Sequence, residues 1–244
     1  MALTVAVLGL GEAGSRLAAD LASAGAEVRG YDPLRAGDPR EAVEGSDVVL
    51  SVNTAKAALD AAESAKPVLG PGAVYADLNT AAPALKRAVA EVVGDVRFAD
   101  VALLGPVPVR GLATPSLASG AGAHAFAEAF EPLGMPVDVV SERAGDAATL
   151  KLLRSVFMKG LAASAVESVQ AAEAAGHAEW LKQEIAAVIG RPLLDRLLVG
   201  SRAHATRRVD EMEAARDLLL ELGIEPRIAS ASGALLEGLA SGGS

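Results

Sequence analysis

The chain has 244 residues, of which 51% are hydrophobic and only 3% aromatic, and its formal net charge is −9. It contains no cysteine, which excludes disulfides, thiol catalysis and cysteine-ligated metals. Its three isolated histidines lack the spacing of metal ligands, and the acidic balance argues against a nucleic-acid partner. No apolar run approaches the roughly 18–20 residues of a membrane span, and nothing at the start resembles a signal peptide. We therefore expect a soluble, cytoplasmic protein with no metal and no nucleic-acid or membrane partner.

Short β-branched runs alternate with longer Ala/Leu-rich segments over the first part of the chain. Strands are predicted at Thr4–Leu8, Glu27–Tyr31, Asp47–Val52, Ala73–Leu78, Val96–Ala102, Ser116–Ser119 and Val137–Val140. Helices are predicted between them at 12–24, 55–65, 82–93 and 123–132. The strands barely alternate between apolar and polar residues, which is typical of a parallel sheet buried on both faces. The order strand, helix, strand predicts an α/β fold with a doubly wound sheet.

The strand patterns stop after Ser141, and the remaining sequence predicts helices at 146–175, 178–189, 192–222 and 229–240. The predicted helix ends coincide with breakers, namely Gly176, Gly190-Arg-Pro192 and Gly223-Ile-Glu-Pro226. At 1.5 Å per residue the first of these helices would span roughly 45 Å. We predict an N-terminal Rossmann domain over 1–142 and a smaller all-helical domain over 143–244 for substrate binding and dimerisation.

A glycine-rich turn follows the first strand, in the stretch V-L-G-L-G-E-A-G of residues 7–14. A strand precedes it, a helix follows it, and an acidic residue ends the next strand, which is the arrangement of a Rossmann dinucleotide site. Gly9 would permit the tight turn, Gly11 would let the backbone approach a pyrophosphate, and Gly14 would let helix and strand pack closely. The helix N-terminus would attract the pyrophosphate. The predicted cofactor contacts here are Gly9, Leu10, Gly11, Glu12, Ala13 and Gly14; the alternative is a turn that binds nothing.

Asp32 is the acidic residue at the end of the second predicted strand. Its carboxylate would accept hydrogen bonds from the ribose hydroxyls of the adenosine and repel a 2′-phosphate, so we expect NAD rather than NADP. Arg35 lies nearby in the sequence and keeps NADP as the alternative.

Two further predicted strands end in polar residues, with Val52-Asn53-Thr54 after the third and Asn79-Thr80 after the fourth. Ligands of open α/β sheets lie outside the carboxyl ends of the strands. Val52, Asn53, Thr54, Asn79 and Thr80 are therefore predicted cofactor contacts. Helix N-capping is the alternative at the two threonines.

The sequence resembles the β-hydroxyacid dehydrogenase superfamily, which includes 3-hydroxyisobutyrate and 6-phosphogluconate dehydrogenases, over nearly its whole length. The resemblance rests on four stretches: V-A-V-L-G-L-G-E-A-G of residues 5–14, Asp77-Leu-Asn-Thr-Ala-Ala-Pro83, Gly145-Asp-Ala-Ala-Thr-Leu-Lys151 and Ala205-Thr-Arg-Arg-Val-Asp-Glu-Met-Glu213. The last is similar to a less characterised branch with a short phosphogluconate-dehydrogenase-type C-terminal domain. The resemblance implies a Rossmann fold, a nicotinamide coenzyme and a catalytic lysine at Lys151.

Two positions depart from the pattern of the hydroxyacid dehydrogenases. The asparagine one helical turn beyond the catalytic lysine is Ser155 in this chain. The serine of the substrate-binding Asp-x-x-x-Ser-Gly-Gly segment is Leu104, within Asp100-Val-Ala-Leu-Leu-Gly-Pro106. The resemblance therefore implies the fold and the cofactor, and leaves the substrate open.

Lys151, Ser155 and Lys159 follow one another at i, i+4 and i+8, so they lie along one face of a helix. As general acid/base, Lys151 would take the hydroxyl proton while hydride leaves carbon, and burial would lower its pKa for this task. Ser155 would hydrogen-bond the substrate, and Lys159 would pair with a carboxylate or phosphate. All three are candidate catalytic residues; for a helical lysine the alternative is a solvated surface position.

Arg110, in the loop Gly105-Pro-Val-Pro-Val-Arg-Gly111, is a candidate for binding a substrate anion, with a solvated loop charge as the alternative. A group of charged residues further on is expected to form a solvated, ion-paired helix face, or to send an arginine to the active site: Arg207, Arg208, Asp210, Glu211 and Glu213.

These observations predict an NAD(P)-dependent oxidoreductase that transfers hydride between nicotinamide and a small, anionic hydroxy acid or its carbonyl counterpart. One alternative is an imine reductase, because relatives of this fold reduce C=N bonds without the lysine. Another is a dinucleotide-binding sensor without turnover. The long apolar helices predict a homodimer.

Overall fold

The computed structural model describes residues 2–34 and 37–242. The chain forms two compact units, Met1–Lys151 and Leu152–Ser244. The dividing point lies inside the long helix α7 (Asp146–Ala174). The first unit is α/β and the second is helical throughout its described part, so the predicted fold class is confirmed.

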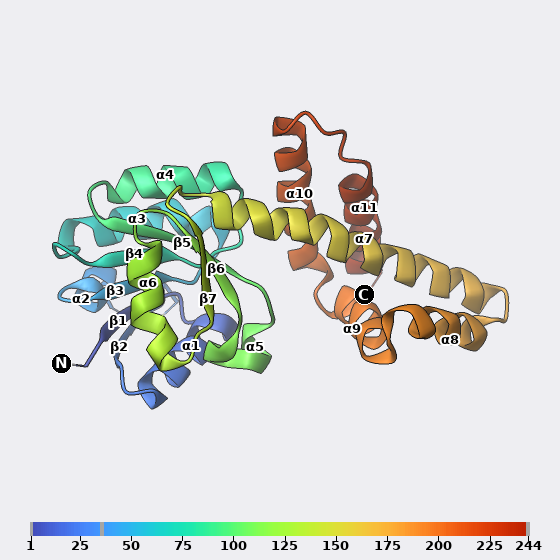
Figure 1. Ribbon diagram of the computed structural model, residues 1–244, viewed down its shortest axis with the longest axis horizontal. Coiled ribbons are helices and arrows are strands. Elements are labelled where there is room, and N and C mark those ends of the chain that lie inside the picture. Colours follow the sequence, from blue (N-terminus) through green and yellow to red (C-terminus); the bar gives the residue numbers. More distant parts are fainter. Residues whose placement is uncertain (1, 35–36, 243–244) are drawn as a thin grey trace. The chain divides into compact units, whose positions relative to one another are not determined.

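A seven-stranded sheet forms the centre of the first unit (Figure 1). Its strands are β1 (Thr4–Leu8), β2 (Glu27–Tyr31), β3 (Val48–Ser51), β4 (Val74–Asp77), β5 (Arg97–Leu103), β6 (Ser116–Ser119) and β7 (Val137–Ser141). They lie in the order β2-β1-β3-β4-β5-β6-β7. After β2 the chain crosses to the other side of β1, so the topological switch point lies at β1 and β3, where open α/β sheets bind ligands. The sequence predicts every one of these strands.

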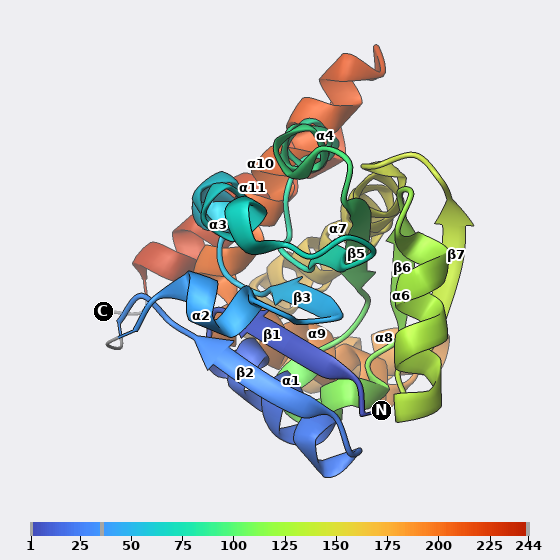
Figure 2. The same cartoon turned by 90° about the vertical axis from the view of Figure 1, so that its left-hand side faces the viewer.

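Helices cover both faces of this sheet (Figure 2). One face carries α1 (Glu12–Ser23), α5 (Val107–Arg110) and α6 (Ala123–Phe130), and the other carries α2 (Pro39–Val43), α3 (Ala58–Ala65) and α4 (Pro83–Val93). Short 3₁₀ helices lie at Ala55–Ala57, Lys66–Val68, Gly111–Ala113 and Glu131–Leu133. The first face is centred on leucines of α1 and the stacked rings of Phe126 and Phe130. The second uses small residues such as Ala62, which lets its helices lie close to the sheet.

β6 departs from the parallel arrangement that the apolar strands predict. It runs antiparallel to β5, whereas the other neighbouring strands pair in parallel. A parallel return needs a crossover, usually through a helix. The segment between β5 and β6 contains only the short α5 and a 3₁₀ turn, and the Leu104 N–H donates to the Pro115 carbonyl (2.8 Å), which closes the loop on itself. β6 therefore begins beside the end of β5 and runs in the opposite direction.

The helices α2 and α5 are absent from the sequence prediction. Both are short and both contain proline in the first turn, so neither has the length over which helical periodicity becomes visible. In α2 the start is fixed by Asp38, whose side chain accepts a hydrogen bond from the Arg40 N–H.

The second unit comprises the later part of α7 with α8 (Ala178–Ile189), α9 (Arg191–Ala203), α10 (Ala205–Glu221) and α11 (Arg227–Ser241). The prediction of one helix over 192–222 is wrong, because the chain leaves helical geometry at His204 (φ −127°, ψ 27°). Neither glycine nor proline marks this break. Ser201 Oγ donates to the Leu197 carbonyl and accepts from Arg208 Nη1 (2.9 Å), so a side-chain contact across the turn supports it.

The core of the second unit lies between α7, α10 and α11, where Leu152, Met212 and Leu236 are fully buried. α10 and α11 lie side by side (Figure 1). By contrast, α8 has no fully buried residue among its described positions, and its Trp180 and Val188 are largely exposed. Among residues 2–34 and 37–242, no helix combines the length and apolar character that crossing a membrane requires.

Candidate active site

The glycine-rich turn lies at the carboxyl end of β1, beside the end of β3. Gly9 has φ +107°, and a Cβ there would be 2.2 Å from the Val52 carbonyl oxygen. A Cβ at Gly14 would be 1.9 Å from the Gly9 carbonyl oxygen. Both are closer than any real contact, so strand, turn and helix α1 meet here only because these two residues lack side chains.

Gly11 differs from its two neighbours because a Cβ there would meet no described atom within 4 Å. It is the N-cap of α1, and no side chain in the described structure caps that helix end. The first-turn N–H groups of an uncapped helix attract anions. Packing therefore does not require glycine at this position, whereas close approach of a ligand to the backbone would. The residues of the turn fit a pyrophosphate group.

Asp32 holds the turn from the neighbouring strand. Its Oδ2 accepts from the Leu10 N–H (2.8 Å), and its Oδ1 accepts from the Leu34 N–H (2.9 Å). A carboxylate oxygen accepts more than one hydrogen bond, so these contacts are compatible with a ribose hydroxyl. Arg35, on which the NADP alternative depends, lies outside the described residues.

Asn53 and Asn79 form a polar network at the ends of β3 and β4. The Asn53 N–H donates to Asn79 Oδ1 (2.6 Å), and Asn79 Nδ2 donates to Asn53 Oδ1 (2.9 Å). Both side-chain amides also donate to Ser51 Oγ, at 3.0 and 3.1 Å. The network fixes the sheet edge next to the glycine turn, with Asn79 buried and Asn53 partly exposed.

The two threonines predicted at this edge do not cap helices, in contrast to the alternative that the sequence allowed. Thr54 precedes a 3₁₀ helix but makes no capping bond within the described chain. α4 begins after Ala82, beyond Thr80. The Thr80 hydroxyl instead accepts from Lys151 Nζ (2.7 Å).

Lys151 reaches Thr80 because two of the sequence motifs meet. Gly145, which precedes α7, has φ +97°, and a Cβ there would be 2.9 Å from the Pro83 carbonyl oxygen. The start of α7 therefore packs against the start of α4. This contact brings Lys151, within the first unit, beside the segment that also carries Asn79.

Ser155 and Lys159 have a different partner, in the second unit. Lys159 Nζ lies 2.9 Å from Glu211 Oε1 of α10, and the Ser155 hydroxyl donates to the same oxygen. Ser155 is buried, and the Lys159 and Glu211 side chains are 15% and 13% exposed. Burial lowers the pKa of Lys159, and the nearby Glu211 opposes this shift. The expectation of a solvated face is therefore wrong at Glu211.

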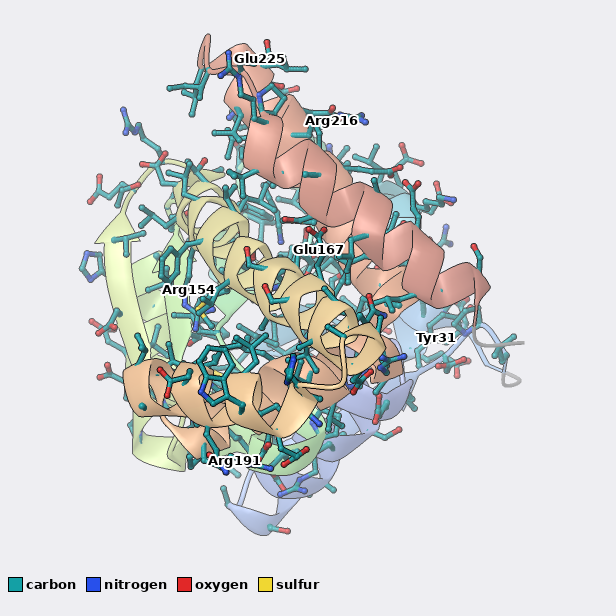
Figure 3. The ribbon with its side chains drawn as sticks, turned by 90° about the vertical axis from the view of Figure 1, so that its right-hand side faces the viewer. Tyr31, Arg154, Glu167, Arg191, Arg216 and Glu225 are labelled. Carbon is teal, nitrogen blue, oxygen red and sulfur yellow. The ribbon has the colours of Figure 1, made fainter. Side chains whose placement is uncertain are left out.

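Arg154, on the neighbouring turn of α7, is exposed and lies on the face drawn in Figure 3. Arg208 of α10 is half-buried, which lowers the pKa of its guanidinium, and it contacts Ser201. Arg154 is therefore exposed to solvent, whereas Arg208 is partly withdrawn from it.

Arg110 lies at the end of α5, fully on the surface of the first unit. Its loop is tied to α1, since Arg16 Nη1 donates to the Pro108 carbonyl (3.1 Å) and Asp20 Oδ2 accepts from the Leu112 N–H (2.9 Å). The latter bond lowers the pKa of Asp20. Leu104 is partly buried.

One buried group escaped the sequence analysis altogether. Lys86 of α4 is 1% exposed and lies between Asp77 and Asp100. Its position on the buried face of an amphipathic helix was the available signal, because a lysine at a core position requires an ionic partner.

Comparison with known proteins places the chain among relatives. Residues 172–239 match a family model described as a domain of unknown function, DUF1932. An uncharacterised 28.5 kDa protein of Methanothermus fervidus is 30% identical over 193 residues, which cover 78% of this chain and 74% of that protein.

Solved structures share the fold over the whole length. A conserved protein of unknown function, described as structurally similar to 3-hydroxyacid dehydrogenases, has 27% identity and a TM-score of 0.78, over 98% of this chain and 97% of that one. The 3-hydroxyisobutyrate dehydrogenase of Mycobacterium tuberculosis, solved with L-serine, has 20% identity and a TM-score of 0.83, over 99% and 95%. A reductive aminase of Aspergillus terreus, solved with NADPH, has 17% identity and a TM-score of 0.63, over 100% of this chain and 95% of that one.

The M. fervidus relative, the DUF1932 match and the shared fold together confirm the resemblance seen in the sequence. The chain belongs to the same family as the M. fervidus protein, its C-terminal region carries a DUF1932 domain, and it shares the fold of the 3-hydroxyacid dehydrogenases.

Proposed function

We propose that this protein is an NAD(P)-dependent oxidoreductase acting on a small hydroxy acid or on the corresponding carbonyl compound. The observation that carries the proposal is the edge of the first unit, where the open Gly11, the Asn53–Asn79 network and the Lys151–Thr80 pair belong to neighbouring elements. An uncapped helix end binds an anion, and a lysine beside polar strand ends supplies an acid/base group. The fold of known hydroxyacid dehydrogenases supports the assignment.

The residues that would hold a dinucleotide are those of the turn and of the two strand ends. Backbone N–H groups from Gly11 to Gly14 would bind the pyrophosphate, and Asp32 the adenosine ribose. Val52, Asn53, Thr54, Asn79 and Thr80 would line the path toward the nicotinamide. The bound nicotinamide would accept or give up the hydride; the protein residues supply position and proton transfer.

We propose NAD as the preferred coenzyme. The Asp32 carboxylate would stand next to the 2′-position, where it favours a hydroxyl and repels a phosphate. Some proteins that share this fold have been solved with NADP or NADPH, and calorimetry with both coenzymes tests the preference of this chain.

Lys151 is the proposed general acid/base. In the oxidative direction its neutral amine takes the proton of the substrate hydroxyl while hydride leaves the same carbon, and in the reductive direction its ammonium returns that proton. The hydrogen bond from Lys151 to Thr80 holds the nitrogen in place.

Ser155 and Lys159 are proposed to contact the substrate, together with Arg110 as a further site for its anion. Glu211 already pairs with Ser155 and Lys159. A substrate carboxylate or phosphate would therefore have to exchange with the Glu211 carboxylate for these two groups.

The test is a turnover screen in which NADH fluorescence is followed with panels of hydroxy acids, aldehydes and imines. Consumption or production of NADH with a hydroxy acid or its carbonyl counterpart is the expected result. Turnover with imines alone would indicate an imine reductase instead. Coenzyme binding without turnover on any compound would contradict the enzyme assignment and indicate a sensor.

We also propose that the protein is a homodimer through its second unit. The 29-residue α7 would be about 44 Å long at 1.5 Å per residue, and a groove of about 170 Å³ opens between α7, α8 and α9 near the exposed Val199. Exposed apolar surface of this kind marks protein contacts. Light scattering at micromolar concentration should report twice the monomer mass; a monomer would contradict the proposal.

A further inference from the structure

A buried ionic cluster lies beneath the sheet edge of the first unit. The Lys86 ammonium is 3.3 Å from Asp77 Oδ2 and 3.2 Å from Asp100 Oδ1, and it donates to the Asp77 backbone carbonyl (2.8 Å). The side chains are 1% exposed for the lysine and 0% for both aspartates. Lys86 comes from α4, and the aspartates come from β4 and β5, so one cation joins three elements.

The second oxygen of each aspartate binds a segment that carries a site residue. Asp77 Oδ1 accepts from the Asn79 N–H (3.0 Å), next to Thr80. Asp100 Oδ2 accepts from the Ala148 N–H (2.9 Å), in the first turn of α7 and one turn before Lys151. The two aspartates therefore anchor the two segments whose side chains form the Lys151–Thr80 hydrogen bond.

Ser119 of β6 adds a contact on the α7 side. Its Oγ accepts from the Ala147 N–H (3.0 Å) and lies 3.3 Å from Asp100 Oδ2. The start of α7 is thus held by a carboxylate and a hydroxyl, and the helix dipole favours negative charge at this end.

The ammonium is required by the geometry of the cluster. Within the described chain, Asp77 Oδ2 and Asp100 Oδ1 accept no hydrogen bond and are fully buried, so Lys86 is what compensates their charge. Without it, two carboxylates of neighbouring strands would repel each other in a medium of low dielectric. A packed apolar group in the same place is often as stabilising as a buried ion pair, so stability alone does not account for the cluster.

We propose that Lys86 is a positioning residue of the active site. By holding Asp77 and Asp100 together, it fixes the 79–80 segment and the first turn of α7 relative to each other, and so sets the geometry of the Lys151–Thr80 pair. The expected effect of Lys86 on turnover rests on the function proposed above for Lys151. The effect of Lys86 on the position of the two segments is independent of that function.

The test is amide hydrogen exchange on Lys86→Met, with the exposed Lys66→Met as the matched control. Exchange in the segments 77–82 and 146–150 should accelerate by about tenfold or more, while the β1 amides stay at the wild-type rate, because local opening is separable from global unfolding. Lys66→Met should change neither. Equal acceleration throughout the first unit, or none at all, would overturn the proposal.

A second variant decides the matter if Lys86→Met does not fold. Asp100→Asn leaves one lysine facing one aspartate, so the charges of the cluster still compensate each other. The exposed Asp95→Asn is its control. Exchange should accelerate in 146–150 and stay unchanged in 77–82, because only one anchor is weakened. Acceleration of both segments, or of neither, would contradict the separate anchoring.

The kinetic readout distinguishes positioning from loss of fold. With 3-hydroxyisobutyrate and NAD as probes, Lys86→Met should lower kcat about tenfold or more. Any rise in the KM for NAD should accompany this loss of kcat, because Asn79 and Thr80 are themselves proposed cofactor contacts. A rise in the KM for NAD with unchanged kcat would contradict the proposal. Wild-type protein inactive on every compound of the screen would count against the proposed function, while the exchange result would still decide the role of Lys86.

Discussion

The sheet edge of the first unit and the Ser155–Lys159–Glu211 cluster of the second satisfy their polar groups in different ways. At the sheet edge, Gly11 faces space without described atoms and the end of α1 has no side-chain cap in the described structure. In the second unit, Lys159 and Ser155 share one carboxylate oxygen and are mostly buried.

This difference separates two kinds of polar site on one helix. Groups that are arranged around open space are suited to receive a ligand, whereas groups that satisfy one another mainly hold the protein together. The Lys151–Thr80 hydrogen bond is exposed at the sheet edge, whereas the Lys159–Glu211 pair is mostly buried, although both lysines lie on α7. Four predictions test how far the contrast extends.

Removing the Lys151 amine should have the largest effect. Lys151→Ala should lower kcat by about 10²–10⁴-fold, the usual contribution of a general acid/base, and leave the Kd for NAD within a few-fold. Stopped-flow or steady-state kinetics on the substrate that the screen identifies would measure this. Lys159→Ala is the comparison, with a smaller loss of kcat expected. A larger loss of kcat in Lys159→Ala than in Lys151→Ala would contradict the assignment of Lys151 as the general acid/base.

Gly9→Ala should act on folding rather than on chemistry. The new methyl group would clash with the Val52 carbonyl at a residue with φ +107°, so we expect a loss of about 3 kcal/mol or more in the free energy of unfolding. Urea denaturation measures it. Gly70→Ala is the control, since no described atom lies within 4 Å of a Cβ there and its φ is not positive; equal losses in both variants would show that the turn is not tightly packed.

Gly11→Ala should separate binding from packing. Because a Cβ here meets no described atom within 4 Å, the free energy of unfolding should stay within about 0.5 kcal/mol of wild type. The Kd for NAD should rise about tenfold or more, since the methyl group would stand where the pyrophosphate approaches the backbone. Unchanged NAD affinity in calorimetry would remove the turn from the site.

The sequence predicts much of the sheet edge because its signals are local. Glycine spacing, strand ends and Asp32 all lie within short stretches, and sterics at Gly9 and Gly14 follow from the turn itself. The roles of Lys86 and Glu211 depend on partners from other elements: Asp100 comes from β5, and Lys159 lies 52 residues from Glu211.

Two errors in the predicted fold also arise from contacts between different elements of the chain. The direction of β6 depends on how its connecting loop closes, and the break at His204 depends on a contact between Ser201 and Arg208. Neither is visible in hydrophobic periodicity, which reports local burial and not the path of the chain.

The smallest expected effect is a dependence of stability on pH. Burial lowers the pKa of Lys159 from its ordinary 10.5, so the unfolded chain binds this proton more tightly than the folded chain. The free energy of unfolding should therefore rise as pH increases from the lowered pKa toward 10.5. Urea denaturation at about pH 8 and about pH 10 measures it, and Lys159→Gln should lose this gain relative to wild type. The same gain in the variant would assign it to other groups.

The central claim is that the carboxyl edge of the sheet in the first unit binds a dinucleotide. Isothermal titration calorimetry of the wild-type protein with NAD and with NADP tests it most directly. The account predicts saturable binding of about one equivalent per chain, with NAD bound more tightly than NADP because Asp32 would stand at the 2′-position. Tighter binding of NADP would contradict the role of Asp32, and failure of both to bind at about millimolar concentration would contradict the site itself.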